Sequence, residues 1–449
     1  MGVFNRMRPT VSFFWFRRDL RLDDNAALYH ALKGADAVIP LFIFDTTILD
    51  YLDDKEDKRV QFIHQELHRL NNELRQYGSS LLVRVGKPVE VWKQLLEEYT
   101  IKAVYTNRDY EPTAIARDEA VQDVLKQHGA KFFTYKDQVI FERYEVLKDD
   151  GKPYTVFTPY SKKWKAKLVP FYYKPYPTLS YAGNFYKTGS AGIIPPLESF
   201  GFKSTPFIYP ERALRNEIVS HYTENRDYPA VNGTSKLGIH LRFGTLSIRK
   251  LLSYALERNQ TYVNELIWRE FYQQILFHFP QVVTRAFKTE YDAIQWENEE
   301  AKFAAWCEGK TGFPLVDAGM RELNATGYMH NRVRMVTASF LTKNLLVDWR
   351  WGEAYFAAKL LDFDLASNNG GWQWASGSGT DAAPYFRVFN PQLQLEKFDP
   401  QLKYVKQWVP EYDTADYVAP IISIADSRDR MLKAYKIALE AGFGRLSNR

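Results

Sequence analysis

The spacing of apolar residues changes near residue 135, and this change limits what the chain can fold into. Before it, short apolar runs alternate with amphipathic segments. The apolar runs predict buried strands at residues 11–16, 37–44, 80–85, 102–107 and 131–135. The amphipathic segments predict helices at residues 57–77, 89–99 and 113–128. This alternation is typical of a parallel sheet that is covered by helices on both faces.

The rest of the chain has a different character. Residues 136–209 are rich in Tyr, Pro, Lys and Gly and show weak periodicity, which indicates a long, partly extended connector. From residue 210 onward the spacing is helical, most clearly at 265–279, 314–324, 331–346 and 426–441. A chain of 449 residues also exceeds what a single core usually supports. We therefore predict an α/β N-terminal domain with a doubly wound parallel sheet (residues 1–135), a connector (136–209) and an all-α C-terminal domain (210–449).

Composition excludes several classes of protein. Cys307 is the only cysteine, which excludes an internal disulfide and a cysteine-rich metal site. The histidines show no HExxH motif, so we predict no metal site. The N-terminus has no apolar segment of the kind found in signal peptides, and no run is long enough to span a bilayer, so we expect a soluble, cytoplasmic protein. The net charge of +5 permits a polyanionic partner without requiring one.

Tryptophan is concentrated in one part of the predicted helical domain. Seven of the eleven tryptophans fall between Trp268 and Trp374, and they stand among charged and amide residues. Because a buried indole N–H needs a hydrogen-bond partner, such a cluster is costly to pack. Two interpretations remain open here: stacking surfaces with an electron route, or an unusually aromatic core.

The segment 264–279 reads as a helix with two distinct faces. Ile267 and Phe271 belong to an apolar face that repeats every fourth residue. A second face carries a carboxylate, an indole, a guanidinium and a phenol at positions i, i+3, i+4 and i+7, namely Glu265, Trp268, Arg269 and Tyr272. The plain alternative is a surface helix with an ion pair between Glu265 and Arg269. The indole between them favours the wall of a cavity.

A second helix, beginning at residue 331, places Asn331 and Met335 one turn apart, with Arg332 and Arg334 beside them. An amide and a thioether are a suitable lining for a nucleobase or another aromatic ring. A solvated basic helix start is the alternative, although few polar residues follow.

Two further runs complete the set of candidate segments. Asp362 and Asp364 precede the run NNGGWQW, and helical geometry places Asp364, Asn368 and Trp372 on one face, where they can hydrogen-bond and stack beside a planar heterocycle. The run 233–238 supplies glycines and hydroxyls before a helical stretch, which suits a phosphate. Ser and Thr at such positions usually only cap the helix, so this last signal is weak on its own.

Together these segments resemble the cryptochrome/photolyase family, and most closely the bacterial class I cyclobutane pyrimidine dimer photolyases. The resemblance is carried, in order, by FWFRRDLRLDDNAAL, NELIWREFY, GKTGFPLVDAGMRELNATGYMHNRVRM and GGWQW, and it runs nearly end to end. It implies an α/β antenna domain followed by a helical domain that binds FAD. It also implies light-driven repair of cyclobutane pyrimidine dimers in double-stranded DNA, by electron transfer from excited, reduced FAD to a flipped-out dimer.

The resemblance also assigns roles to individual residues. The FAD phosphates and sugars would be held by Tyr222, Thr234, Ser235, Lys236, Leu237 and Gly238. The flavin ring would be held by Arg269, Arg334, Asp362 and Asp364, with Asn368 at the ring nitrogen that gains a proton. The dimer would lie between Trp268 and Trp374, with Glu265 bonded to the damaged bases and Asn331 and Met335 lining the pocket. DNA phosphates would be met by Arg226 and Arg332, and a three-tryptophan electron relay would be formed by Trp372, Trp349 and Trp296.

The chain departs from the family pattern at several positions. Lys236 and Gly238 stand where Arg and Ser are common, and Tyr262 and Tyr328 replace frequent tryptophans. FAD binding is still expected. At positions where folate-binding relatives have Asn-Glu and Cys-Lys pairs, this chain has Thr113, Ala114, Val283 and Thr284. A folate antenna is therefore not supported, and a deazaflavin, a flavin or an empty crevice remains open.

Three alternatives to a dimer photolyase follow from the same resemblance. A cryptochrome, which is a blue-light receptor without repair activity, usually differs at Trp374, Met335 and Asn368. A photolyase for (6-4) lesions would be expected to have histidines where Asn331 and Met335 stand. A light-independent flavoprotein oxidoreductase would need residues for hydride transfer, and none is visible. We further expect a monomer, because DNA must reach an open cavity.

Overall fold

The computed structural model describes residues 8–35, 37–189 and 192–446. The outer ends of the predicted domains, at residues 1 and 449, lie outside this part. The chain divides into two units. A sheet unit falls within residues 1–142, 168–213 and 236–254, and a helical unit falls within 143–167, 214–235 and 255–449. The predicted connector 136–209 is thus distributed over both units.

A five-stranded sheet forms the centre of the sheet unit. Its strands are β1 (Thr10–Phe16), β2 (Val38–Asp45), β3 (Leu82–Gly86), β4 (Thr100–Asn107) and β5 (Lys131–Tyr135). They pair in the order β3-β2-β1-β4-β5, and every pair is parallel. In the central strand, Phe14 is in register with Pro40 of β2 and Tyr105 of β4. All five predicted strands are confirmed.

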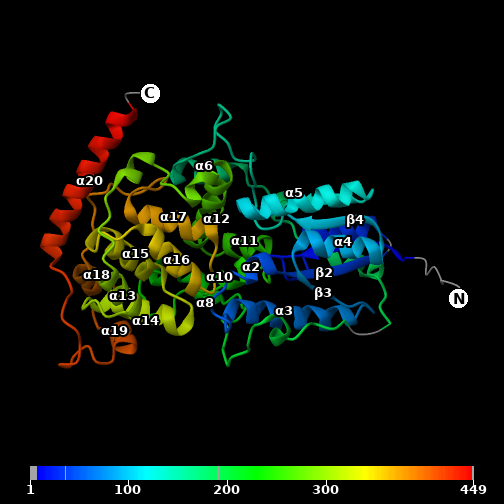
Figure 1. Ribbon diagram of the computed structural model, residues 1–449, viewed down its shortest axis with the longest axis horizontal. Coiled ribbons are helices and arrows are strands. Elements are labelled where there is room, and N and C mark those ends of the chain that lie inside the picture. The colour runs from blue at the N-terminus through cyan, green and yellow to red at the C-terminus, as the bar shows by residue number, and fades with distance from the viewer. Residues whose placement is uncertain (1–7, 36, 190–191, 447–449) are drawn as a thin grey trace. The chain divides into compact units, whose positions relative to one another are not determined.

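Helices cover both faces of this sheet. Val91, Trp92 and Leu95 of α4 pack with Phe13 and other buried residues of β1, β2 and β4. Figure 1 shows α3 on the side of the strands opposite to α4 and α5. The predicted doubly wound arrangement is therefore confirmed. The helical elements that begin in this unit are α1 (Ala26–Gly34), α2 (Thr46–Leu49), α3 (Lys58–Arg75), α4 (Pro88–Glu98), α5 (Pro112–Gln127), α7 (Pro170–Tyr173), η1 (Thr178–Asn184), η2 (Leu197–Phe200), α10 (Gly238–Arg242) and α11 (Ile248–Leu256).

The second unit is built from helices, as the sequence predicted. The segment most relevant to the site, α12, begins at Gln260 because the side chain of Asn259 accepts a hydrogen bond from the Tyr262 backbone and caps it. The elements are α6 (Phe157–Lys167), α8 (Asn216–Ser220), α9 (Tyr222–Asn225), α12 (Gln260–His278), η3 (Pro280–Val283), η4 (Thr289–Ala293), α13 (Glu300–Glu308), α14 (Pro314–Thr326), α15 (Asn331–Ser339), η5 (Phe340–Asn344), α16 (Trp349–Lys359), α17 (Leu365–Ser376), α18 (Pro391–Phe398), α19 (Lys403–Trp408) and α20 (Ile424–Leu446).

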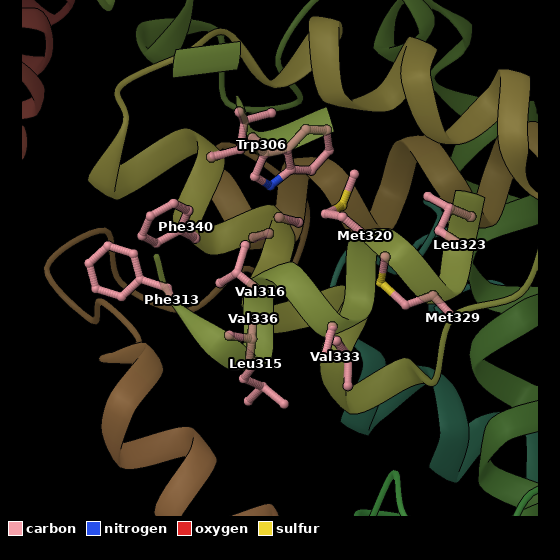
Figure 2. Packing of buried hydrophobic residues seen from close by; sticks show 14 of the residues in the cluster. Trp306, Phe313, Leu315, Val316, Met320, Leu323, Met329, Val333, Val336 and Phe340 are labelled. Carbon is pink, nitrogen blue, oxygen red and sulfur yellow. The ribbon is translucent and has the colours of Figure 1, made fainter. Parts of the chain in front are cut away.

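The core of the helical unit fixes the position of α15. Trp306, Met320, Met329 and Val333 are fully buried in one cluster, and Figure 2 shows the side chains of this cluster close together. A methyl group on Gly319 of α14 would lie under 3.0 Å from Val333, so α14 and α15 approach each other closely. This contact holds the first turn of α15, where two candidate site residues stand.

One predicted helix, residues 331–346, changes its geometry partway. The α-helix ends at Ser339 and continues as the π-helix η5. Thr342 donates a side-chain hydrogen bond to the Ala338 carbonyl at 2.9 Å, and Leu346 has a positive φ of 52° where the turn ends. Apolar spacing alone does not distinguish a π turn from an α turn, so the predicted helix was too long in its α-helical part.

Candidate active site in the helical unit

A cavity of about 400 Å³ lies within the helical unit. It is bounded mainly by α12, α15 and α17, with contributions from α16 and the segment before α17. Most of the residues singled out from the sequence line it together. The lining consists of Arg226, Glu265, Trp268, Arg269, Tyr272, Asn331, Arg334, Met335, Ala338, Phe356, Leu360, Asp362, Phe363, Asp364, Ser367, Asn368, Gly371, Trp372 and Trp374.

The wall formed by α12 follows from its two-faced sequence. Glu265, Trp268, Arg269 and Tyr272 all line the cavity. Residues on the opposite face are buried, with Ile267 and Phe271 completely inaccessible to solvent. Because positions i, i+3, i+4 and i+7 share one side of a helix, burial of the apolar face turns the polar face toward the cavity. The alternative of a solvated surface helix is therefore wrong.

Glu265 has a different partner from the one that its spacing suggested. Its carboxylate forms an ion pair with the guanidinium of Arg226, which follows α9, whereas the surface-helix alternative had paired it with Arg269. Burial raises the pKa of Glu265, and the charge of Arg226 acts in the opposite direction. The result is a half-buried carboxylate on the cavity wall whose charge is balanced by a guanidinium that also lines the cavity.

The wall formed by α15 carries Asn331, Arg334 and Met335. Arg334 donates through Nη2 to Asp362 Oδ2 at 3.0 Å and through Nε to the Met329 carbonyl at 2.7 Å. The other carboxylate oxygen of Asp362, Oδ1, is buried and has no hydrogen-bond partner among the residues that the structure describes. Such an atom is costly to bury, and a donor on a ligand in the cavity could satisfy it.

The wall formed by α17 begins at Asp364, whose side chain caps the helix by accepting from the Ser367 backbone at 3.1 Å. One turn later, Asn368 donates its side-chain N–H to the carboxylate of Glu353 at 2.8 Å and to the Glu353 carbonyl at 3.1 Å. With its amide nitrogen used in this way, Asn368 has its carbonyl oxygen available to a donor in the cavity. Sequence reasoning missed Glu353, because nothing in its local pattern links it to Asn368.

Arg332 does not line the cavity, although its neighbours on α15 do. It forms an ion pair with Asp227 at 2.8 Å and lies over the ring of Phe398, 4.3 Å from the centroid. Its helical position explains this, since residues 331, 334 and 335 share one side of the helix and 332 points away.

The predicted phosphate-binding run is also outside the cavity lining. Thr234 and Ser235 belong to the helical unit, where their hydroxyls bond to Tyr328 at 3.0 Å and to Tyr262 at 2.8 Å. Tyr222 lies in the same unit, with its ring 5.4 Å from the Arg226 guanidinium. Lys236, Leu237 and Gly238 are assigned to the sheet unit.

The three tryptophans of the predicted relay differ in exposure. Trp372 lines the cavity and is 2% exposed, Trp349 is equally buried in the core, and Trp296 is only partly buried. An electron route needs one ring at the cavity and another that reaches solvent, and Trp372 and Trp296 meet these two conditions. Trp306 is fully buried with its ring 6.0 Å from that of Trp372, and it donates its N–H to the Thr337 carbonyl at 3.1 Å.

Sequence reasoning also missed Phe157, because it lies within the predicted connector. The ring of Phe157 stacks on the indole of Trp268 with centroids 3.7 Å apart and planes inclined by 4°. The signal available was the run FTPYSKKWKAK, in which Phe157, Tyr160 and Trp164 recur at helical spacing.

Among the residues that the structure describes, no helix combines the length and the apolar character needed to cross a membrane.

Comparison with known proteins shows that the chain is similar to DNA photolyases. Residues 12–180 match the family model for DNA photolyase, and residues 262–416 match the model for the FAD binding domain of DNA photolyase. The deoxyribodipyrimidine photo-lyase of Escherichia coli is 37% identical over 96% of this chain and 99% of its own length. An archaeal photolyase structure from Sulfolobus tokodaii with two FAD molecules has a TM-score of 0.82 and 37% identity, and covers 95% of this chain and 99% of its own. A Synechocystis cryptochrome structure has a TM-score of 0.81 at 25% identity, with 96% and 100% covered.

Proposed function

This chain belongs to the DNA photolyase family, and we propose that it is a deoxyribodipyrimidine photo-lyase, an enzyme that uses light to repair cyclobutane pyrimidine dimers in DNA. The observation that carries the proposal is the composition of one cavity. Three indoles, a charge-balanced carboxylate and an arginine–aspartate pair all line the same space of about 400 Å³. The relatives that match over most of the chain are named for this activity.

FAD is the cofactor of this family, and the cavity fits its flavin ring. When bound and reduced, FAD supplies a chromophore that can give one electron to a neighbouring group after it absorbs light. Asp362 Oδ1 is an acceptor without a protein partner, which suits a ring N–H. Arg334 and Arg269 supply positive charge beside it. Asn368 has its carbonyl oxygen available, which suits a protonated ring nitrogen as acceptor.

Substrate contacts follow from the same walls. Enzymes that act on a base inside a duplex first swing the nucleotide out of the stack into a pocket. Trp268 and Trp374 would form the flat surfaces against which the dimer packs, with Asn331 and Met335 beside them. Glu265 would accept hydrogen bonds from the damaged bases through the carboxylate whose charge Arg226 balances. Arg226 and Arg332 would contact DNA phosphates, using N–H groups that their ion pairs with Glu265 and Asp227 leave unused.

The electron relay is proposed for a separate task, the reduction of oxidised cofactor. Trp372, Trp349 and Trp296 supply oxidisable rings that run from the cavity wall to a partly exposed position. They are not needed for repair by protein whose cofactor is already reduced.

The proposal is tested by mixing the reduced protein with a duplex that contains one cyclobutane dimer. Illumination should restore the intact bases, and an identical sample in the dark should not change. Restoration can be followed by the return of base absorbance and by chromatography of the digested strand. A light-dependent change in the flavin spectrum without repair would indicate a blue-light receptor instead.

Two finer points belong to the same proposal. We propose that the protein acts as a monomer in the cytoplasm, so light scattering should give a mass near 52.4 kDa. The archaeal relative contains two FAD molecules, so pigments extracted from this protein should be counted per chain. More than one chromophore would identify an antenna, whose chemical class the extraction would then establish.

A further inference from the structure

Phe157 lies flat against one face of Trp268. The ring centroids are 3.7 Å apart and the planes differ by 4°. Trp268 lines the cavity, whereas Phe157 does not. The stacked face of the indole is therefore turned away from the cavity, and Phe157 supports the indole from behind.

Other rings hold the indole at its edges. Phe271 meets it edge-on at 5.6 Å with an interplanar angle of 81°, and Tyr272 lies at 5.6 Å with a tilt of 34°. These edge contacts resist sliding of the indole. Among the aromatic contacts of Trp268 in the described part of the chain, the stacked ring of Phe157 is the one that opposes movement perpendicular to the indole, away from the cavity.

The helix that carries Phe157 is firmly attached to α12. Trp164 of α6 donates its N–H to the carboxylate of Glu270 at 2.5 Å, and Tyr160 donates to the same oxygen at 3.4 Å. Glu270 is 2% exposed and stands two residues after Trp268. Lys165 adds a hydrogen bond to Asn264 at 2.6 Å. Because α6 is fixed to the helix that carries Trp268, Phe157 is held at a constant distance from the indole.

The N-terminal end of α6 is also attached to the segment that follows α17. The Phe157 backbone N–H donates to Asp381 at 3.1 Å, and Thr380 donates to the Thr155 carbonyl at 2.5 Å. Trp374, the second aromatic wall, stands on α17. One short helix thus joins the supports of both indoles.

We propose that Phe157 is a positioning residue that holds the indole of Trp268 in the orientation needed to stack on a flipped pyrimidine dimer. This inference rests on the proposed function. Direct face-to-face overlap is less favourable for two rings than an offset or edge-on arrangement. The overlap therefore reflects the way α6 is anchored, and removal of the flat ring at position 157 leaves the indole free to tilt back from the cavity.

The test compares binding to two duplexes that differ only in one cyclobutane dimer, measured in the dark by fluorescence anisotropy with the FAD-loaded protein. Phe157→Leu keeps an apolar side chain but removes the flat ring. Its affinity for the damaged duplex should fall about threefold to tenfold, in line with the usual strength of an aromatic pair. Its affinity for the undamaged duplex should not change. Phe157→Tyr should restore binding to within about twofold of the wild type, because it restores the ring.

Val156→Ala is the matched control, since Val156 is the preceding residue and is 44% exposed. It should bind both duplexes as the wild type does.

In repair assays, Phe157→Leu should raise KM for the damaged duplex and leave kcat unchanged, whereas a general loss of structure would lower kcat and FAD content together. If Phe157→Leu does not fold, Phe157→Met serves as the second variant, with the same expected result.

The outcomes separate this inference from the proposed function. Wild-type protein that does not prefer the damaged duplex would overturn the proposed function itself. Wild-type preference that survives unchanged in Phe157→Leu or Phe157→Met would overturn the role of Phe157 alone. Equal weakening on both duplexes would also overturn it, because a positioning role acts only on the flipped dimer.

Discussion

The packing of α17 against α12 leaves no room for a methyl group at Gly370. A Cβ atom at that position would lie under 3.0 Å from three ring carbons of Tyr272, a separation that real Cβ atoms essentially never show. Tyr272 lines the cavity. Its ring cannot easily move away from Gly370, because it contacts the rings of Trp268 and Phe271. Gly370→Ala should therefore force the two helices apart or push Tyr272 out of place, at a cost of about 1–3 kcal/mol.

Gly371 provides a control in the next position of the same helix. A Cβ atom there would have no other atom within 4 Å. Both substitutions gain the same helix propensity, about 0.5–1 kcal/mol, so this gain cancels when the two variants are compared. The difference between them isolates the clash with Tyr272.

Thermal unfolding of both variants without cofactor, followed by the helical circular dichroism signal, tests this reasoning. For a unit of this size, 1 kcal/mol corresponds to about 2–4 °C, so Gly370→Ala should melt about 2–12 °C below Gly371→Ala. Gly371 itself lines the cavity, so Gly371→Ala should lose FAD affinity without losing stability. Equal melting temperatures would refute the packing argument, because they would mean that Tyr272 yields without cost.

Three further predictions follow. Glu265→Ala should lower the yield of dimer splitting per absorbed photon while FAD content stays constant; an unchanged yield would remove Glu265 from the substrate contacts. Trp296→Phe should impair photoreduction of oxidised flavin but leave repair by already reduced protein intact, and loss of both would mean that the relay is wrongly assigned. Burial raises the pKa of Asp19 in the sheet unit to about 6 from 3.8, so the folded state binds this proton more tightly and the unfolding free energy should fall by about 3 kcal/mol as the pH rises from 3.8 to 6. Urea unfolding at several pH values should show this fall in the wild type and not in Asp19→Asn, whereas identical pH profiles would contradict it.

The parts of the molecule that the sequence predicted are those set by local periodicity. Short apolar runs predicted all five strands. The runs are continuous in β1 and β2, because strands that are buried on both faces have no polar alternation. The cavity face of α12 was predicted because Trp268 and Arg269 each follow Glu265 by about one helical turn. Once burial selects the opposite face, the orientation of these side chains follows. The resemblance to a known family then indicated which helix faces would meet.

The parts that the sequence did not predict depend on contacts between distant segments. For Glu265 the sequence offered one ion-pair partner, Arg269 at a spacing of one helical turn, and only in the surface-helix alternative. Arg226 takes that place because the chain brings α9 to the polar face of α12, which periodicity does not report. Glu353 of α16 accepts a hydrogen bond from Asn368 of α17, and periodicity does not report this contact between two helices either.

Two departures from the family pattern, Tyr262 and Tyr328, are explained by the hydrogen bond that each tyrosine makes. Tyr262 and Tyr328 stand at positions where tryptophan is frequent in the family. In the structure their hydroxyls bond to Ser235 and Thr234. An indole carries only an N–H donor and could not accept from these hydroxyls, whereas a phenol can both donate and accept. The tyrosines therefore orient the hydroxyls that the resemblance assigns to the FAD phosphates, so replacing either tyrosine with Trp should affect that run rather than the cavity.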